Sequence, residues 1–243
     1  MKKKSRKNKK AQEVVITSLS FSEYNRQIVR KFHTEIAVNS LNIMIILPIV
    51  LILDLVIPFI LAPSYKGYNH LTQVMSVLGN SKAPFHNVYN MWLIVFGITL
   101  AVIDFKIYAI ISESSKLIAV ILFFIVLIYA IGGCILSGLF SVGEVKSLDT
   151  LSEKIHGYGS VIGFMCLTFA PLLVGIYAYK INDIKFLFFC IGCFILAILF
   201  FSCFVMGDKP NYKNTFLALE GLWQRLSLLF MYLPLGCLML LEK

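Results

Sequence analysis

The chain is predicted to be an all-α, polytopic membrane protein built as a bundle of six transmembrane helices. Hydrophobic residues make up 58% of its 243 residues and charged residues only 14%, against about 25% charged residues in ordinary soluble domains. Six apolar stretches, separated by breaker residues, are each long enough to cross a bilayer, which takes about 20 helical residues. Because lipid offers the backbone no hydrogen-bond partners, each stretch is expected to be a helix.

The six predicted spans occupy residues 41–243 as a single transmembrane domain. They cover Leu41–Ala62, Tyr89–Ser112, Leu117–Phe140, His156–Tyr179, Ile184–Met206 and Leu222–Leu241. The connections at Glu113–Lys116 and Asn182–Asp183 are so short that they predict antiparallel neighbours. The longest connection, Pro63–Val88, is expected to carry a short amphipathic helix near Leu71–Leu78. Loops of this length are often functional.

A basic arm, residues 1–40, precedes the first span. Its first ten residues hold seven basic and no acidic residues, and the whole arm contributes +7 to the net charge of +9. A capping box at Ser20–Glu23 opens an amphipathic pattern that predicts a short interfacial helix. The lysines are expected to attract an anionic lipid surface. Since no aromatic or glycine-rich module accompanies them, we expect no nucleic-acid partner.

The basic residues also predict the orientation of the chain. With the amino terminus inside, fifteen of the 22 Lys and Arg residues fall on the cytoplasmic side and seven on the other. The positive-inside rule therefore favours both termini in the cytoplasm. Lys outnumbers Arg by eighteen to four, which indicates an AT-rich bacterial genome. We expect a multi-pass protein of the bacterial plasma membrane.

Several smaller signals concern helix packing. Gly159 and Gly163 form a small-xxx-small pattern that lets two helices approach closely. Pro58, Pro171 and Pro234 are expected to kink three spans. All six cysteines fall inside predicted spans and are expected to be buried thiols, since the one C-x-x-C pattern lacks the context of a redox site.

Charged residues within spans are costly unless they are paired or hydrated. Asp54 lies in the first span and Arg225 begins the last, at a similar depth on the same side. A contact between Asp54 and Arg225 would avoid burying either charge alone. Asp104 and Lys106, near the cytoplasmic end of the second span, are expected to form an interfacial pair with a snorkelling lysine.

Three motifs fall near the ends of predicted spans: Ser76-Val-Leu-Gly79 followed by Asn90, His156-Gly157, and Gly221-Leu-Trp-Gln-Arg225. They resemble the Ser-x-Leu-Gly turn, the His-Gly pair and the Gly-x-x-x-Arg segment of a bacterial membrane family catalogued as domain of unknown function 998. The resemblance implies a multi-helix integral membrane protein, and it supplies no activity to carry over.

The first functional hypothesis is a non-enzymatic protein with a polar pocket at its extracytoplasmic face. The candidate binding residues for a lipid headgroup or small amphiphile are Asp54, Ser76, Asn90, His156 and Arg225. Arg225 would hold an anionic group, while Tyr68 and Trp92 would anchor the rim. No cofactor is expected. The structural alternative is that these polar groups only tie helix ends and the long loop together.

Two other functions stay open from the sequence. A metal-dependent hydrolase of a membrane lipid would use His70, His86 and His156 as zinc ligands, with Asp54 or Glu153 acting on the bound water. The spacing of these histidines matches no compact ligand pattern. A small-molecule transporter would often show two repeated halves, which we do not detect. Neither the substrate nor the oligomeric state follows from the sequence.

Overall fold

The computed structural model describes residues 45–141, 143 and 148–238, and over this part of the chain it contains helices and turns without strands. The first helix is Ile45–Ser64. The long helices after it are α2 (His86–Ser114), α3 (Lys116–Ile128), α5 (Leu151–Leu167), α6 (Ala170–Lys180), α7 (Ile184–Gly207) and α8 (Glu220–Leu238). The predicted basic arm and its interfacial helix lie outside the described residues.

Five helical stretches are long and apolar enough to cross a membrane. They are Ile45–Ser64, His86–Ser114, Lys116–Leu139, Leu151–Lys180 and Ile184–Gly207, which match the first five predicted spans. The sixth prediction corresponds to α8, whose described residues are less apolar because its first turns carry Glu220, Gln224 and Arg225. The all-α, polytopic fold class is confirmed.

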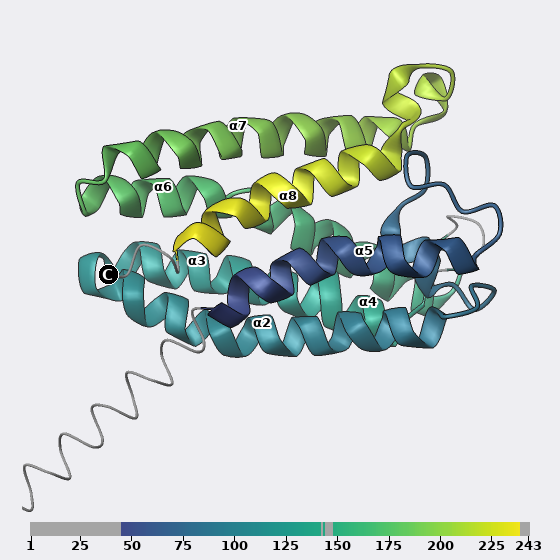
Figure 1. The fold of residues 1–243 in the computed structure, drawn as a ribbon, viewed down its shortest axis with the longest axis horizontal. Helices are drawn as coiled ribbons and strands as arrows, with labels where there is room; N and C mark the ends of the chain where they lie inside the picture. Colours follow the sequence, from purple (N-terminus) through teal and green to yellow (C-terminus); the bar gives the residue numbers. More distant parts are fainter. Residues whose placement is uncertain (1–44, 142, 144–147, 239–243) are drawn as a thin grey trace, which may run out of the picture. The chain divides into compact units, whose positions relative to one another are not determined.

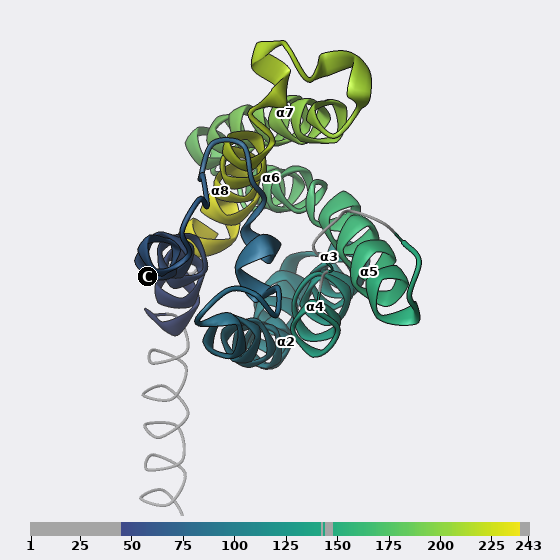
Figure 2. The same cartoon turned by 90° about the vertical axis from the view of Figure 1, so that its right-hand side faces the viewer.

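The helices pack in an order that brings the last one back to the first. The first helix lies beside α2 and α8 (Figures 1 and 2), and Asp54 of the first helix contacts side chains of both. α2 also packs against α3, while α7 packs against α6 and α8. Large apolar side chains such as Phe105 and Phe188 stay exposed along the spans, as expected for surfaces that face lipid.

Both short connections join antiparallel neighbours, as predicted. A single extended residue, Ser115, links α2 to α3. Between α6 and α7, Asn182 adopts a left-handed conformation with φ of 60°. Asp183 then caps α7, because its Oδ1 accepts a hydrogen bond of 3.0 Å from the amide of Phe186. Asn tolerates the left-handed conformation and Asp is a favourable N-cap residue, so the sequence of this second turn suits its structure.

The third span is a single helix interrupted by a π-helical segment. α3 continues into η3 (Tyr129–Ile135) and then α4 (Leu136–Leu139). Here the predicted glycine contact appears: a Cβ on Gly132 would lie 2.5 Å from the carbonyl oxygen of Gly159, and one on Gly163 would lie 2.8 Å from the amide nitrogen of Gly133. α5 thus packs backbone to backbone on the π-helical segment, an approach that side chains would prevent.

The fourth span is broken in two. Thr168 and Phe169 separate α5 from α6, and Pro171 occupies the first turn of α6, where a missing N–H costs least. Of the three prolines predicted to kink a span, Pro171 alone lies at a break between two helices in the described residues. Pro58 and Pro234 lie inside continuous helices. The six cysteines are free thiols.

Replacing Gly132 with Ala should loosen the contact between the π-helical segment and α5. The new Cβ meets backbone atoms of Gly159, which cannot rotate away, so we expect a loss of about 1–3 kcal/mol in the free energy of unfolding. Thermal unfolding of the detergent-purified protein measures this loss. Gly192→Ala is the matched control, because a Cβ at Gly192 would meet no atom within 4 Å. Equal stability of the two variants would contradict the packing described here.

Candidate functional site

Arg225 binds the long loop to the last helix. The connections before α2 and α8 lie at the same end of the bundle as the start of α5, and this end is called here the loop end (Figure 1). Arg225, in the second turn of α8, donates through Nη1 to the carbonyl oxygens of His70 at 2.8 Å and Gly221 at 2.7 Å. Nη1 also lies 3.3 Å from the carbonyl oxygen of Gln73, and Nη2 donates to the hydroxyl of Tyr68 at 2.7 Å. One guanidinium therefore gathers three backbone carbonyls and one phenol.

The glycine four residues before Arg225 makes this contact possible. A Cβ on Gly221 would lie 2.5 Å from the carbonyl oxygen of His70 and closer still to that of Gln73. The first turn of α8 also bonds the loop directly: the amide of Leu222 donates to the carbonyl oxygen of Leu71 at 3.0 Å. The Gly-x-x-x-Arg spacing thus places a bare backbone against the loop, with the arginine one turn later collecting the loop's acceptors.

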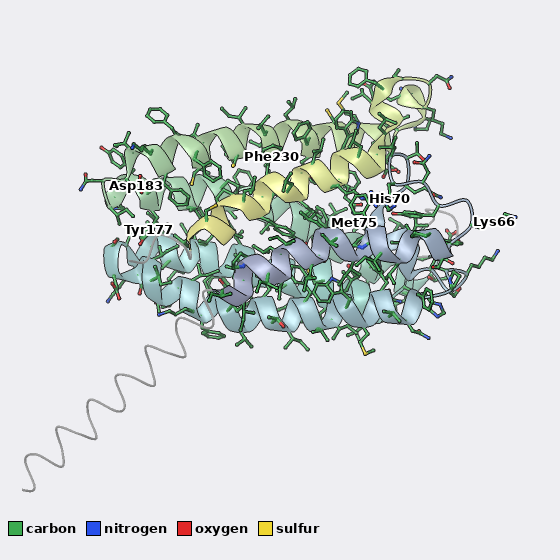
Figure 3. The ribbon with its side chains drawn as sticks, viewed as in Figure 1. Lys66, His70, Met75, Tyr177, Asp183 and Phe230 are labelled. Atoms are coloured by element: carbon green, nitrogen blue, oxygen red, sulfur yellow. The ribbon has the colours of Figure 1, made fainter. Side chains whose placement is uncertain are left out.

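The amide side chain of Gln224 adds a further bond, because its Oε1 accepts from the amide of Met75 at 2.7 Å. Figure 3 shows His70 and Met75 at the loop end, near the start of α8, with Lys66 farther out on the loop. Loop and helix are therefore joined at several points along the loop, which makes residues 65–79 a docked part of the bundle.

Phe59 and His70 flank the guanidinium. Their rings stack with centroids 4.4 Å apart, and Arg225 Cζ lies 5.5 Å from the centroid of the Phe59 ring. The distance between Arg225 Nη2 and His70 Nδ1 is 3.3 Å. Since arginine only donates, the Nδ1 atom of His70 acts as an acceptor in this contact and the imidazole is neutral.

The charge of Arg225 has no acidic partner among the residues that the structure describes. Its hydrogen bonds end on carbonyls, a phenol and an imidazole, all of them neutral. The residue is only 8% exposed, and its Nε has no hydrogen-bond partner. A buried cation without a counter-charge is unusual, so the Arg225 guanidinium is a positive charge that an anion would neutralise.

The two loop side chains beside Arg225 have shifted pKa values. Burial lowers the pKa of His70 from its ordinary value, and the charge of Arg225 lowers it further. Burial raises the pKa of Tyr68, although the charge of Arg225 and the hydrogen bond to it act in the opposite direction. Both shifts keep these side chains neutral beside the guanidinium.

A second joint holds the far end of the loop. Ser76 and Gly79 lie in the 3-10 helix η2 (Met75–Gly79), which replaces the amphipathic helix predicted nearby. Asn90, in the second turn of α2, donates through Nδ2 to the carbonyl oxygen of Gly79 at 3.1 Å. A Cβ on Gly79 would clash with the Asn90 side chain. The hydroxyl of Ser76 has no hydrogen-bond partner within the described residues.

His156 forms a third joint. It lies in α5, which begins with a capping box formed by Thr150 and Glu153. Its Nδ1 lies 2.8 Å from the carbonyl oxygen of Phe140 and 3.2 Å from that of Ser137. Because carbonyls only accept, Nδ1 carries the proton. His156 thus satisfies the last turn of the third span, where helical carbonyls have no partner of their own.

A family model described as a protein of unknown function (DUF998) matches residues 48–241. The chain belongs to the DUF998 family. No protein with a curated function and no solved structure matches this chain. The recognised motifs of this DUF998 protein therefore correspond to three physical joints at the loop end: Arg225 with Gly221, Asn90 with Gly79, and His156 with the end of the third span.

The predicted contact between Asp54 and Arg225 is wrong. Asp54 Oδ1 accepts from Trp92 Nε1 at 3.1 Å, and Oδ2 accepts from the hydroxyl of Tyr232 at 2.8 Å. The hydroxyl of Tyr232 is also hydrogen-bonded to that of Tyr129. Asp54 therefore belongs to a buried network joining four spans of the DUF998 domain, and Trp92 serves that network instead of a pocket rim.

The three histidines proposed as metal ligands are not brought together. His70 lies beside Arg225, His156 bonds the third span, and the Nδ1 of His86 contacts the carbonyl oxygen of Ala83 at 2.8 Å. No group of three or more His, Cys, Asp or Glu side chains among the described residues is arranged to hold a metal. Glu153 serves as a helix cap.

Sequence reasoning missed several residues of the site. Phe59 sits in an apolar run that gives no sign of its stacking on His70. The partners of Asp54 on α2 and α8 are separated from it by long stretches of sequence. The cap at Thr150 could have been found, because Thr150-x-x-Glu153 is a capping-box pattern. It places the start of α5 before the predicted start of the span at His156.

Replacing Gly221 with Ala should release the loop from α8. The added Cβ meets the carbonyl oxygens of His70 and Gln73, so Arg225 can no longer gather them in the same geometry. We expect trypsin to cut after the exposed Lys66 several-fold faster than in the unmodified protein. Gly192→Ala serves as the control that adds the same methyl group in open space. Unchanged cleavage in Gly221→Ala would show that the loop does not depend on this close approach.

The stability of the protein should fall in acid partly because of His70. Its pKa in the folded state lies below the ordinary value, so the unfolded chain binds the proton more readily. The stabilising contribution is present above about pH 6.5 and is lost as the pH falls through the lower, folded-state pKa. Unfolding temperatures measured from about pH 7.5 to 5 should drop less in His70→Gln than in the unmodified protein. If the unfolding temperatures of the two proteins fall in parallel with pH, then titration of His70 does not cause the loss of stability.

Proposed function

We propose that this DUF998 protein binds the anionic headgroup of a membrane lipid at its loop end, without catalysing a reaction. The observation that carries the proposal is the uncompensated guanidinium of Arg225, which has no carboxylate partner among the described residues and an unpartnered Nε. Guanidinium groups are well suited to phosphate because their donors match its oxygens. A phosphate beside Arg225 would supply the missing negative charge.

The neighbouring side chains suit a lipid better than a free anion. Phe59 is 50% exposed on the first helix, so its ring borders both the guanidinium and the apolar surface of that helix. An acyl chain could follow this surface while the headgroup reaches the arginine. His70 contributes no positive charge to this site, because its imidazole is neutral in the contact with Arg225. Recognition of the headgroup therefore depends on Arg225.

The loop end belongs, in this proposal, to the extracytoplasmic side of a bacterial plasma membrane, with both termini in the cytoplasm. The support is the distribution of basic residues, fifteen on the inner and seven on the outer side. The basic arm, residues 1–40, would separately attract anionic lipid of the inner leaflet. We propose no nucleic-acid partner and no cofactor.

Lipid retained by the purified protein tests the proposal. The full chain is placed in nanodiscs containing equal amounts of phosphatidylglycerol and phosphatidylcholine, and the bound lipid is counted by native mass spectrometry. Removing the charge in Arg225→Gln should lower the ratio of anionic to zwitterionic lipid about fivefold, which corresponds to about 1 kcal/mol for one charge near the surface. Arg225→Lys should keep most of the preference.

The control for this experiment is Lys66→Ala, which removes an exposed charge from the same loop without touching the guanidinium. Trypsin cleavage at the loop reports whether each Arg225 variant is still docked. An unchanged lipid ratio in a docked Arg225→Gln protein would overturn the proposal. An equal loss in Lys66→Ala would show that general surface charge, and not Arg225, attracts the lipid.

A further inference from the structure

Asp104 is a buried acid that the site at the loop end does not use. It lies in α2, within a membrane-spanning stretch, and is 0% exposed. Neither of its carboxylate oxygens has a hydrogen-bond partner among the described residues. The predicted interfacial pair with Lys106 is therefore wrong, since the structure gives no ion pair between them. Residues two apart on a helix point in different directions.

Asp54 provides a comparison within the same bundle. It is also an aspartate in a span and is 2% exposed, but both of its oxygens accept hydrogen bonds, from Trp92 and from Tyr232. The network around Asp54 stabilises a carboxylate. No described residue donates a hydrogen bond to Asp104, although the two aspartates are alike in chemistry and burial.

The elements packed against α2 supply no partner for Asp104. Their titratable groups are Asp54 on the first helix, Lys116, Tyr129 and Cys134 on the third span, Tyr177, Tyr179 and Lys180 on α6, and Glu220, Arg225, Tyr232 and Cys237 on α8. None of these groups hydrogen-bonds or pairs with Asp104 in the described structure. An ionised carboxylate there would be buried without a donor or a cation, which is the most unfavourable state for an acid in lipid.

We propose that Asp104 is a proton-binding site inside the membrane domain, which holds a proton in the packing described here and exchanges it when α2 is exposed to water. A proton needs one basic oxygen, whereas metal cations take several ligand oxygens, and no group of three potential metal ligands is present among the described residues. Proton exchange changes only the O–H bond: the acid releases H⁺ to water and becomes a carboxylate. This inference is independent of the proposed lipid site.

Infrared spectroscopy of the full chain in nanodiscs tests the proposal directly. At neutral pH the unmodified protein should show the C=O absorption of a protonated, non-hydrogen-bonded carboxyl group. Asp104→Asn should lose this band, and Asp54→Asn should keep it. Absence of the band in the unmodified protein, or its persistence in Asp104→Asn, would overturn the proposal.

Thermal unfolding against pH gives a second, independent readout. Asn has nearly the shape of a neutral Asp, so Asp104→Asn should unfold at the same temperature as the unmodified protein in acid. Above about pH 4 the unfolded chain releases this proton, whereas the folded protein must keep it. The unmodified protein therefore loses stability as the pH rises, and the variant should unfold at a higher temperature from neutral pH upward. A variant that is destabilised at every pH would show that Asp104 acts as a carboxylate with a structural role, and would overturn the proposal.

Discussion

The loop end of this DUF998 protein depends on one buried guanidinium. Loop backbone that lies against a helix end must find partners for its carbonyls, because the neighbouring helix uses its own hydrogen bonds internally. Arg225 supplies these partners by donating to His70, Gln73 and Gly221 at once. Gly221 makes this possible by leaving room for the loop, which explains why a Gly-x-x-x-Arg segment works as a unit: either residue alone would leave carbonyls unpaired or backbone atoms in collision.

The other motif positions continue the same principle along the loop end. Asn90 closes the loop onto α2 through Gly79. Next to it, a Cβ on Gly138 would lie 2.5 Å from the carbonyl oxygen of Asn90, so the third span packs closely on the start of α2. His156 then ties α5 to the end of that span. Most of these polar residues are therefore explained by the alternative that they only tie helix ends and the long loop together. Arg225 is different, because tying the loop down accounts for its Nη donors only. Its Nε has no hydrogen-bond partner, and its charge has no counterpart among the described residues.

Hydropathy was sufficient to predict the first five spans, since a lipid-facing helix must be apolar over a fixed length whatever its neighbours are. Local patterns also predicted the turn at Asn182–Asp183 and the close contact of Gly159 with another helix. Contacts between distant spans were beyond this reasoning. Asp54 and Arg225 share a depth, and depth alone suggested a pair, but the rotation of each helix about its axis decides which side chains meet. That rotation is set by packing such as the glycine contact at the π-helical segment, which no single stretch of sequence reveals.

The two buried aspartates show how far the surroundings determine what a residue can do. In the sequence, both are single acids within apolar stretches, and any rule based on composition treats them alike. The structure gives Asp54 a tryptophan and a tyrosine as donors, so its charge is spread over a network that joins spans. Asp104 is fully buried, and neither of its carboxylate oxygens has a hydrogen-bond partner among the described residues. A carboxyl group kept in such a place contributes little to stability that Leu would not supply better. Its presence is therefore better explained by a proton that it binds and releases than by the packing of α2.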